Sequence, residues 1–406
     1  MLKEPKYHNS WKGKVLKVLL IFSLVSLVFF TFLSTPLFVS GTTYLPHTLH
    51  SQLTGATALS DTTPFDVYGT DLGIILKHNG KYHYIFGDTL GSGGLNWRSN
   101  TIAYSFDTNP SDGLSLNGWI VSPTSGHAKE LISSLKIDYV EKTSIPTAAV
   151  SHNNLMYIFY MSVRHWGTPG VWECNNASIA VSNDNGQNFL KMANISWPGG
   201  SNFVQFGLVQ DALSPIDDGC FYFLATPSGR FGACYLCRVP YNSLLDQSAY
   251  EYYSDYDSFN NPIWSSLHTD AISIFPAPVG ELSIMWNAYL NKWTVFYFDS
   301  ITLDIVLRTA NHLWGPWSAP QAIVGAIEYP TLYGSYVHPD FVENSGEVVY
   351  FIMSKFNVYN TFVLSVDLGS LPSSSLGFQM FPVVILSMIT ISLPFLRLKL
   401  KRHRHS

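Results

Sequence analysis

Short apolar runs, rich in aromatic and β-branched side chains, recur along the middle of the chain and are separated by Gly, Asn, Asp and Pro. Runs of this length between turn residues predict β-strands, and no long stretch between Tyr68 and Val366 has the period of an amphipathic helix. The five clearest strands each follow a polar turn, and they are Lys81–Gly87, Met156–Met161, Cys220–Ala225, Trp293–Phe298 and Val348–Met353.

Each of these strands has neighbours of the same kind. The preceding strands are predicted at Thr70–Leu76, Pro146–Val150, Gln205–Val209, Leu282–Trp286 and Tyr336–Phe341. The clearest following strands are Ser178–Ser182, Ala233–Val239, Ile305–Thr309 and Thr361–Val366. The unit recurs five times, at intervals of roughly 55 to 75 residues. This recurrence predicts an all-β fold, a five-bladed β-propeller.

Two long apolar runs flank the predicted propeller. Val18–Val39 contains no charge and follows five lysines, which is typical of a signal peptide or a first membrane span. Leu376–Leu396 is a second such run, and a basic cluster follows it. We expect an N-terminal membrane anchor or signal segment at residues 1–41, a propeller ectodomain at residues 42–370, and a C-terminal transmembrane helix with a basic tail at residues 371–406.

The basic flanks of both apolar runs indicate cytoplasmic termini. The expected location is therefore the cell membrane, with the propeller on the extracytoplasmic side; whether the N-terminal segment is cleaved stays open. The four cysteines, Cys174, Cys220, Cys234 and Cys237, fit an oxidising exterior. A hairpin about residues 226–229 brings Cys220 opposite the segment from Cys234 to Cys237, so we expect one cross-strand disulfide there.

Charge separates the ends of the chain from its middle. The chain has 23 basic and 28 acidic residues, but ten of the basic residues and one of the acidic residues lie in the two tails. Residues 42–375 therefore carry 13 basic and 27 acidic side chains, a net charge of −14. Such a surface repels a phosphate backbone, and this excludes nucleic acid as a partner.

Acidic residues at the starts of the predicted inner strands are the main candidates for chemistry. Inner strands converge at one end of a propeller axis, so Asp71 of the first unit and Glu281 of the fourth are expected to meet. Glycoside hydrolysis needs one protonated carboxyl and one carboxylate, and crowding pushes the two pKa values apart. Glu281 is assigned as general acid and Asp71 as base or nucleophile, with the reverse assignment open. Asp88 would orient the pair, raise the pKa of the acid or bind sugar hydroxyls.

Five further residues are candidates for substrate binding. Arg98 would either form a structural ion pair with Asp71 or Asp88 or bind a sugar oxygen, and Arg230 poses the same question. Trp166 and Trp172 would stack on sugar rings or pack between blades. His338 is expected to line the funnel at the start of the last unit. The sequence has neither the ligand spacing of a zinc site nor a phosphate-binding glycine loop, so we expect no metal and no cofactor.

Six motifs occur in the order seen in the domain-of-unknown-function 4185 family. They are Gly69-Thr-Asp-Leu-Gly73, Phe86-Gly-Asp-Thr89, Trp97-Arg-Ser-Asn100, Gly280-Glu-Leu-Ser283, Gly315-Pro-Trp-Ser318 and Tyr333-Gly-Ser-Tyr-Val-His-Pro339. The chain resembles this family over roughly residues 65 to 366. Members resemble five-bladed propeller glycosidases, and some are endo-acting D-arabinanases. The resemblance implies an endo-acting glycoside hydrolase whose substrate is an arabinan-like cell-envelope or environmental polysaccharide.

Two other functions fit the same sequence. A catalytically inactive propeller would bind glycans without cleaving them, and a structural ectodomain would leave its funnel unused. The identity and linkage of the glycan, the retaining or inverting outcome, the full disulfide pairing and the oligomeric state stay open.

Overall fold

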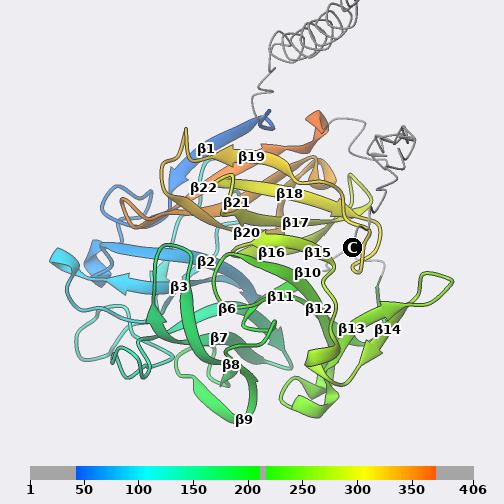
Figure 1. Cartoon of the computed structure of the whole chain (residues 1–406). Helices are drawn as coiled ribbons and strands as arrows, with labels where there is room; N and C mark the ends of the chain where they lie inside the picture. Colours follow the sequence, from blue (N-terminus) through cyan, green and yellow to red (C-terminus); the bar gives the residue numbers. More distant parts are fainter. Residues whose placement is uncertain (1–42, 211–215, 372–406) are drawn as a thin grey trace, which may run out of the picture. The chain divides into compact units, whose positions relative to one another are not determined.

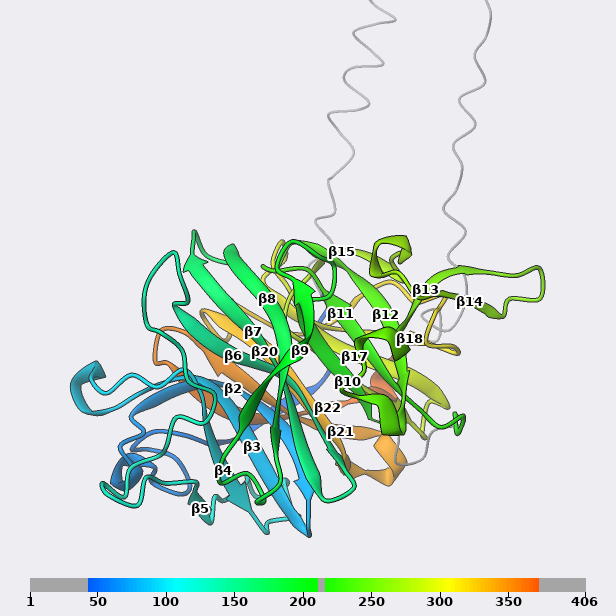
Figure 2. The same ribbon diagram turned by 90° about the horizontal axis from the view of Figure 1, so that it is seen from below.

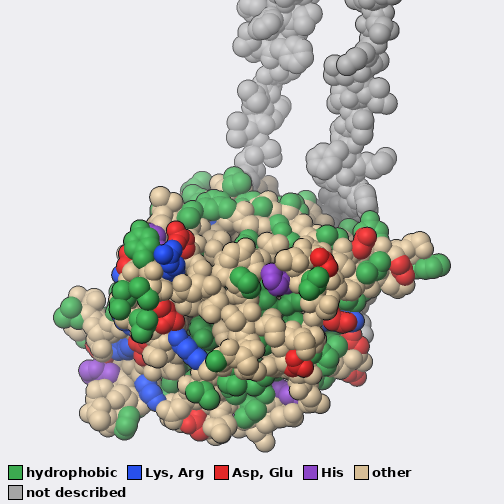
Figure 3. Space-filling view, turned by 60° about the horizontal axis from the view of Figure 1, so that its bottom comes forward, with side chains coloured by type: hydrophobic (Ala, Val, Ile, Leu, Met, Phe, Trp, Pro, Cys, Tyr) green, Lys and Arg blue, Asp and Glu red, His purple; other side chains and the backbone are tan. Residues whose placement is uncertain are grey.

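The computed structural model describes residues 43–210 and 216–371. The apolar runs at residues 18–39 and 376–396 lie outside the described residues. The described residues contain no helix of the length and hydrophobicity that a membrane span requires. Figure 3 shows one face of the molecule, on which uncharged polar and hydrophobic side chains predominate and Lys and Arg are few.

Antiparallel strands in chain order make up the first two blades. Blade 1 consists of β2 (Gly69–His78), β3 (Lys81–Leu90), β4 (Thr101–Ser105) and β5 (Gly118–Trp119). Blade 2 consists of β6 (Thr143–His152), β7 (Leu155–Trp166), β8 (Trp172–Ser182) and β9 (Leu190–Pro198). The aromatic strands predicted from the sequence at residues 81–87 and 156–161 lie within β3 and β7, the second strand of each blade.

The next two blades share one sheet. Blade 3 consists of β10 (Gln205–Gln210), β11 (Cys220–Thr226), β12 (Gly232–Pro240) and β13 (Glu251–Tyr256), extended by β14 (Pro262–Ser265), while β15 (Phe275–Val279) pairs with β12. Blade 4 consists of β16 (Leu282–Asn287), β17 (Lys292–Asp299), β18 (Asp304–Ala310) and β19 (Gln321–Gly325). The inner strands β10 and β16 pair in parallel, and this pairing joins the two blades.

Blade 5 closes the ring with strands from both ends of the described chain. It consists of β20 (Leu332–Glu343), β21 (Val348–Lys355), β22 (Asn360–Asp367) and, on its outer edge, β1 (His47–Gln52), which runs antiparallel to β22. The inner strands contact one another in the cyclic order β2, β6, β10, β16, β20 and back to β2. Figures 1 and 2 show the blades following one another around the middle of the molecule. The predicted five-bladed ring is confirmed by this topology.

The helical segments of the described residues are all short 3₁₀ turns. They are η1 (Thr63–Phe65), η2 (Ser92–Gly94), η3 (Tyr241–Ser243), η4 (Gln247–Ala249), η5 (His268–Asp270), η6 (Asn344–Gly346) and η7 (Leu368–Ser370). The all-β fold class predicted from the sequence is therefore confirmed for the described part of the chain.

Aromatic side chains fill the spaces between blades. Between blades 2 and 3, Phe159 packs on Phe223 with ring centroids 4.6 Å apart, and the fully buried Trp197 packs on Phe206 at 4.8 Å. Side chains of the inner strands also close the axis, leaving a cavity of only about 20 Å³ lined in part by Ile74. A cavity of this size holds about one water molecule, so the ring has a floor and not an open channel.

The predicted disulfide between β11 and β12 is wrong. All four cysteines are free thiols in the structure. The strand register places Cys237 opposite Phe223 and Cys220 opposite Pro240. Cys220 is thus three positions along the hairpin from the residue opposite Cys237, too far for the Cα separation that a disulfide requires.

Candidate active site

The starts of the inner strands meet at one end of the axis. The five inner strands run in the same direction around the ring, so their first residues lie on the same face. Asp71 is the third residue of β2, Thr143 is the first residue of β6, Gln205 is the first residue of β10, Glu281 directly precedes β16 and Tyr333 is the second residue of β20. Residues that are far apart in the sequence thus share one polar site.

Asp71 lies in the middle of this site with only one of its oxygens hydrogen-bonded. Its Oδ2 accepts a hydrogen bond from the Tyr333 hydroxyl at 2.8 Å, while its buried Oδ1 has no partner among the described residues. Gly87 of β3 leaves the space that Oδ1 occupies, because a Cβ at that position would overlap it. Burial, and then the charge of Asp88, raise the pKa of Asp71 to about 7, although the Tyr333 hydrogen bond opposes this shift. Asp71 can therefore carry a proton near neutral pH.

Asp88 of β3 supplies the second carboxyl group. Its Oδ1 accepts hydrogen bonds from Trp97 Nε1 at 2.8 Å and from Thr143 Oγ1 at 2.6 Å. Burial raises the pKa of Asp88 to about 6 in spite of these bonds. Two neighbouring acids with raised pKa values are typical of sites that transfer protons.

Glu281 is held by Arg230 in a bidentate ion pair. Arg230 Nε lies 3.0 Å from each carboxylate oxygen, and its Nη2 lies 2.7 Å from Oε1. The Glu281 side chain is 10% exposed and the Arg230 side chain is 19% exposed. Three charge-assisted hydrogen bonds to both oxygens are the contacts of a carboxylate and not of a neutral acid. Glu281 therefore enters the site as an anion whose charge is balanced.

The turn between β11 and β12 fixes the position of Arg230. Gln205 Nε2 donates hydrogen bonds to the carbonyl oxygens of Pro227 and Gly229, and the Arg230 backbone N–H donates to the Gly170 carbonyl at 2.8 Å. The guanidinium also lies 4.7 Å from the centroid of the Tyr333 ring. Arg230 thus contacts the residue that donates to Asp71 as well as Glu281.

Sequence reasoning missed the tyrosines of this site. Burial, and then the charge of Asp71, raise the pKa of Tyr333 well above its usual value. Burial, followed by the charges of Asp71 and Asp88, does the same to the pKa of Tyr359, which directly precedes β22. Tyr333 opens one of the motifs of the family resemblance, and this was the available signal. With 23 tyrosines in the chain, residue type alone does not single these two out.

The two predicted tryptophans lie beside Arg230. Trp172 is buried, and the Arg230 guanidinium carbon lies 5.7 Å from its ring centroid. Its Nε1 has no hydrogen-bond partner in the described part of the chain. Trp166 packs edge-on against Trp172 at 5.4 Å and is 36% exposed. The structure therefore brings this pair to the edge of the carboxyl site.

Arg98 lies near Asp88 in the fold but its side chain is used elsewhere. Its Nη2 donates to the backbone carbonyl of Asp66 at 2.6 Å, and its Nη1 lies 3.2 Å from the carboxylate of the same residue. The side chain is 6% exposed. This geometry corrects the prediction that Arg98 pairs with Asp71 or Asp88 or binds sugar. The Arg98 guanidinium is paired with Asp66 instead.

His338 does not line the site. It lies six residues after the start of β20, buried against Tyr82 at the other end of the strand. β20 starts at Leu332, before the predicted start at Tyr336, and its pairing with β21 is irregular between Tyr333 and Tyr336. The first position in the site therefore belongs to Tyr333 and not to His338.

Residues 43–210 and 216–371 contain no group of three or more His, Cys, Asp or Glu side chains that could hold a metal ion. The acids of the site contact protein groups in this structure: hydroxyl and indole donors bind Asp71 and Asp88, and a guanidinium binds Glu281.

The chain is similar to a protein family, to a curated protein and to solved structures. The family described as "Domain of unknown function (DUF4185)" matches residues 57–365. A curated protein, "Notoamide biosynthesis cluster protein J'" of Aspergillus versicolor, is 26% identical over 298 residues, which is 67% of this chain and 77% of that protein. A solved structure described as a "putative hydrolase" from Bacteroides ovatus has a TM-score of 0.54 at 13% identity, covering 74% of this chain and 86% of that chain. An exo-β-1,3-galactanase of Phanerochaete chrysosporium has a TM-score of 0.48 at 11% identity, covering 79% of this chain and 64% of that chain.

Proposed function

Since the chain belongs to the DUF4185 family, and its inner strands bring two carboxyl groups with raised pKa values next to an ion-paired glutamate, we propose that it is a glycoside hydrolase. The observation that carries the proposal is the Asp71 carboxyl. Burial and the charge of Asp88 raise its pKa to about 7, it has one oxygen without a partner in the described structure, and the charge of Glu281 acts on it. Hydrolysis of a glycosidic bond requires this combination of a proton donor and a carboxylate.

The ionisation of the site favours Asp71 as the proton donor. Asp71 with a pKa of about 7 delivers its proton to the leaving glycosidic oxygen. Glu281, held as an anion by Arg230, acts as the base that activates water or as the nucleophile. Asp88 keeps the pKa of Asp71 high through its charge. This is the reverse of the assignment that we preferred from the sequence, and the Arg230 ion pair is the reason.

The proposed substrate is a polysaccharide of the cell envelope or the environment, arabinan-like by family resemblance, cleaved by endo action. The proposed location is the extracytoplasmic side of the cell membrane, with the apolar runs at residues 18–39 and 376–396 as tethers. The acidic, aromatic-rich composition of the middle of the chain supports an exterior protein that binds sugars and not phosphates.

The test is the release of reducing ends from arabinan by the purified protein and its variants. Asp71→Asn and Glu281→Gln should each lower the rate by about 10³-fold or more, because each removes one of the two groups that act in the transition state. Asp340→Asn is the matched control, since Asp340 lies on β20 away from this site, and it should keep wild-type activity. Wild-type rates in both site variants would contradict the proposal.

The ion pair itself favours a second candidate, a glycan-binding propeller without activity. A glutamate that makes three hydrogen bonds to an arginine can serve the structure alone. In that case arabinan would bind to the wild type and to Glu281→Gln with similar affinity, and neither protein would release reducing ends.

A further inference from the structure

Two pairs of exposed aromatic side chains lie on the loops around the carboxyl site. Tyr68 and Phe356, here called the first platform, are 45% and 66% exposed. Trp166 and Phe231, here called the second platform, are 36% and 51% exposed. Leaving aromatic rings in water forgoes the stabilisation that their burial would give, so neighbouring exposed rings beside a site point to a ligand.

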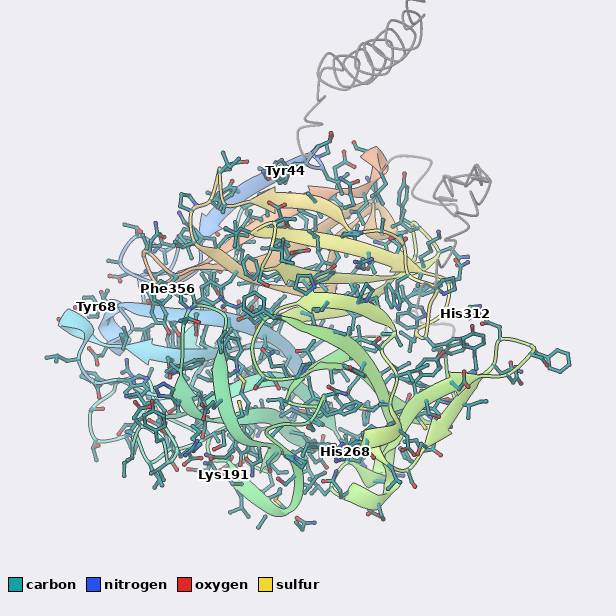
Figure 4. All side chains as sticks on the ribbon, viewed as in Figure 1. Tyr44, Tyr68, Lys191, His268, His312 and Phe356 are labelled. Carbon is teal, nitrogen blue, oxygen red and sulfur yellow. The ribbon has the colours of Figure 1, made fainter. Side chains whose placement is uncertain are left out.

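The first platform adjoins Asp71. Tyr68 directly precedes β2, and Phe356 lies in the turn between β21 and β22. The Phe356 and Tyr359 rings are 6.0 Å apart, and the Tyr359 carbonyl accepts a hydrogen bond from Thr70 N–H at 2.7 Å. Figure 4 shows the labelled Tyr68 and Phe356 at the same edge of the molecule, with His312 at the opposite edge. The first platform therefore lies next to Tyr359, whose pKa is raised by burial and then by the charges of Asp71 and Asp88.

The second platform adjoins the Arg230–Glu281 pair. Phe231 directly follows Arg230, and its ring packs close to Gly170, where a Cβ would lie 3.1 Å from Phe231 Cε2. Trp166 contacts Trp172, which in turn lies over the Arg230 guanidinium. The glycine keeps the two loops close enough for both rings to share this side of the site.

The order of the blades puts the platforms on opposite sides of the carboxyl groups. The first platform lies where blades 5 and 1 adjoin, and the second lies where blades 2 and 3 adjoin. The two platforms are two blade intervals apart around the ring, so the carboxyl groups at the starts of the inner strands lie between them. Below the site the inner-strand side chains Ile74, Leu282 and Tyr336 are buried, so a chain molecule cannot thread through the ring and has to lie across its mouth.

We propose that the first platform, Tyr68 and Phe356, binds a polysaccharide chain across the carboxyl groups from the second platform, Trp166 and Phe231. This inference rests on the proposed function and gives each side of the cleavage point its own aromatic contact. The occupant is a glycan of several sugars, because aromatic faces stack on the apolar faces of sugar rings and the platforms continue into a site of hydrogen-bonding groups. A substrate held on both sides is cut within the chain and not at its end.

The experiment measures the kinetics of Phe356→Ala and Tyr68→Ala on arabino-oligosaccharides from disaccharide to octasaccharide. On the octasaccharide the KM should rise by about 3- to 10-fold per variant with kcat unchanged, since a stacking contact is worth that much in binding. The disaccharide, too short to reach both platforms, should show no difference. Phe259→Ala is the matched control, because Phe259 is 84% exposed in the distant turn between β13 and β14, and it should behave as wild type.

Binding of the octasaccharide to the Asp71→Asn protein, measured by calorimetry, tests the aromatic platform separately from the hydrolase activity. If wild type cleaves arabinan and the platform variants keep wild-type KM values at every length, the platform inference is overturned and the hydrolase stands. If nothing is cleaved but the octasaccharide binds and Phe356→Ala weakens it about 3- to 10-fold, the platform stands and the hydrolase falls. Octasaccharide binding that is insensitive to Phe356→Ala and Tyr68→Ala overturns the platform in either case.

Discussion

The strands β2 and β20 each carry an ionisable cluster at both ends, and the two clusters differ sharply. At the first end, Asp71 Oδ2 accepts a hydrogen bond from Tyr333, and Oδ1 has no partner in the described structure. At the other end, Asp340 accepts hydrogen bonds from Lys77 Nζ at 2.6 Å and Tyr82 at 2.7 Å. The ends are about six strand residues apart, or ~20 Å.

The same residue type thus has opposite protonation behaviour within one pair of strands. Burial and the charge of Asp88 raise the pKa of Asp71 to about 7. At Asp340, burial also acts against the charged form, but the bonds from Lys77 and Tyr82 outweigh it and lower the pKa of Asp340. The comparison teaches that the fold satisfies a carboxylate where its role is structural and leaves one incompletely satisfied where a proton can be exchanged.

The largest change in the free energy of unfolding is expected when Arg230 is replaced. Arg230→Met leaves Glu281, whose side chain is only 10% exposed, without its partner next to Asp71. The free energy of unfolding should fall by about 3 kcal/mol, because an unpaired buried charge costs more than the pair contributes. Chemical denaturation at pH 7 measures it. The double variant Arg230→Met/Glu281→Gln should recover most of the loss; equal loss in both would show that packing of the arginine, and not charge, is responsible.

A smaller effect is expected from Asp71→Asn, and its sign depends on pH. The folded protein binds the Asp71 proton more tightly than the unfolded chain, so this contribution to stability is present below pH ~4 and is lost as the pH rises through about 7. At pH 8 the variant should therefore be more stable than wild type by about 2 kcal/mol, and at pH 4 the two should be equal. Urea denaturation at both pH values decides this. A variant less stable than wild type at pH 8 would contradict the raised pKa.

The smallest effect is expected from Asp340→Asn, with the opposite pH dependence. The folded pKa of Asp340 is lowered, so its contribution to stability is present above the unfolded pKa and disappears as the pH falls through the folded pKa. The variant should lose about 1 kcal/mol at pH 7, since Lys77 is half exposed and the pair is screened by solvent. The loss should shrink when the same denaturation is repeated at pH 3. An unchanged loss at pH 3 would mean that shape, and not charge, matters there.

The strands were predictable because their signal is local. Aromatic and β-branched residues between turns mark β3, β7, β11, β17 and β21, and regular recurrence identifies the ring. Ring topology then brings Asp71 and Glu281 to one end without any knowledge of side chains. Their chemical roles stay predictions.

The partners of these residues were not predictable, because contacts between distant segments decide them. Arg98 could reach several carboxyl groups by sequence, and only the loop geometry selects Asp66. Whether Arg230 forms an ion pair or binds a sugar oxygen was equally open, and the structure shows an ion pair with Glu281. The early start of β20 and its irregular pairing with β21 carry no clear signature in the sequence, so Tyr333 was missed and His338 was misplaced.

The outer position of β1 in blade 5 has a consequence for biosynthesis. His47 pairs opposite Val366, so the first strand of the propeller to leave the ribosome finds its partner only after almost all the other strands have been made. Until then β1 has no strand edge to pair with, and blade 1 lacks blade 5 as its neighbour. A nascent propeller of this kind presents unpaired strand edges to other chains, and we expect its folding to depend on protection from aggregation until synthesis has passed Asp367.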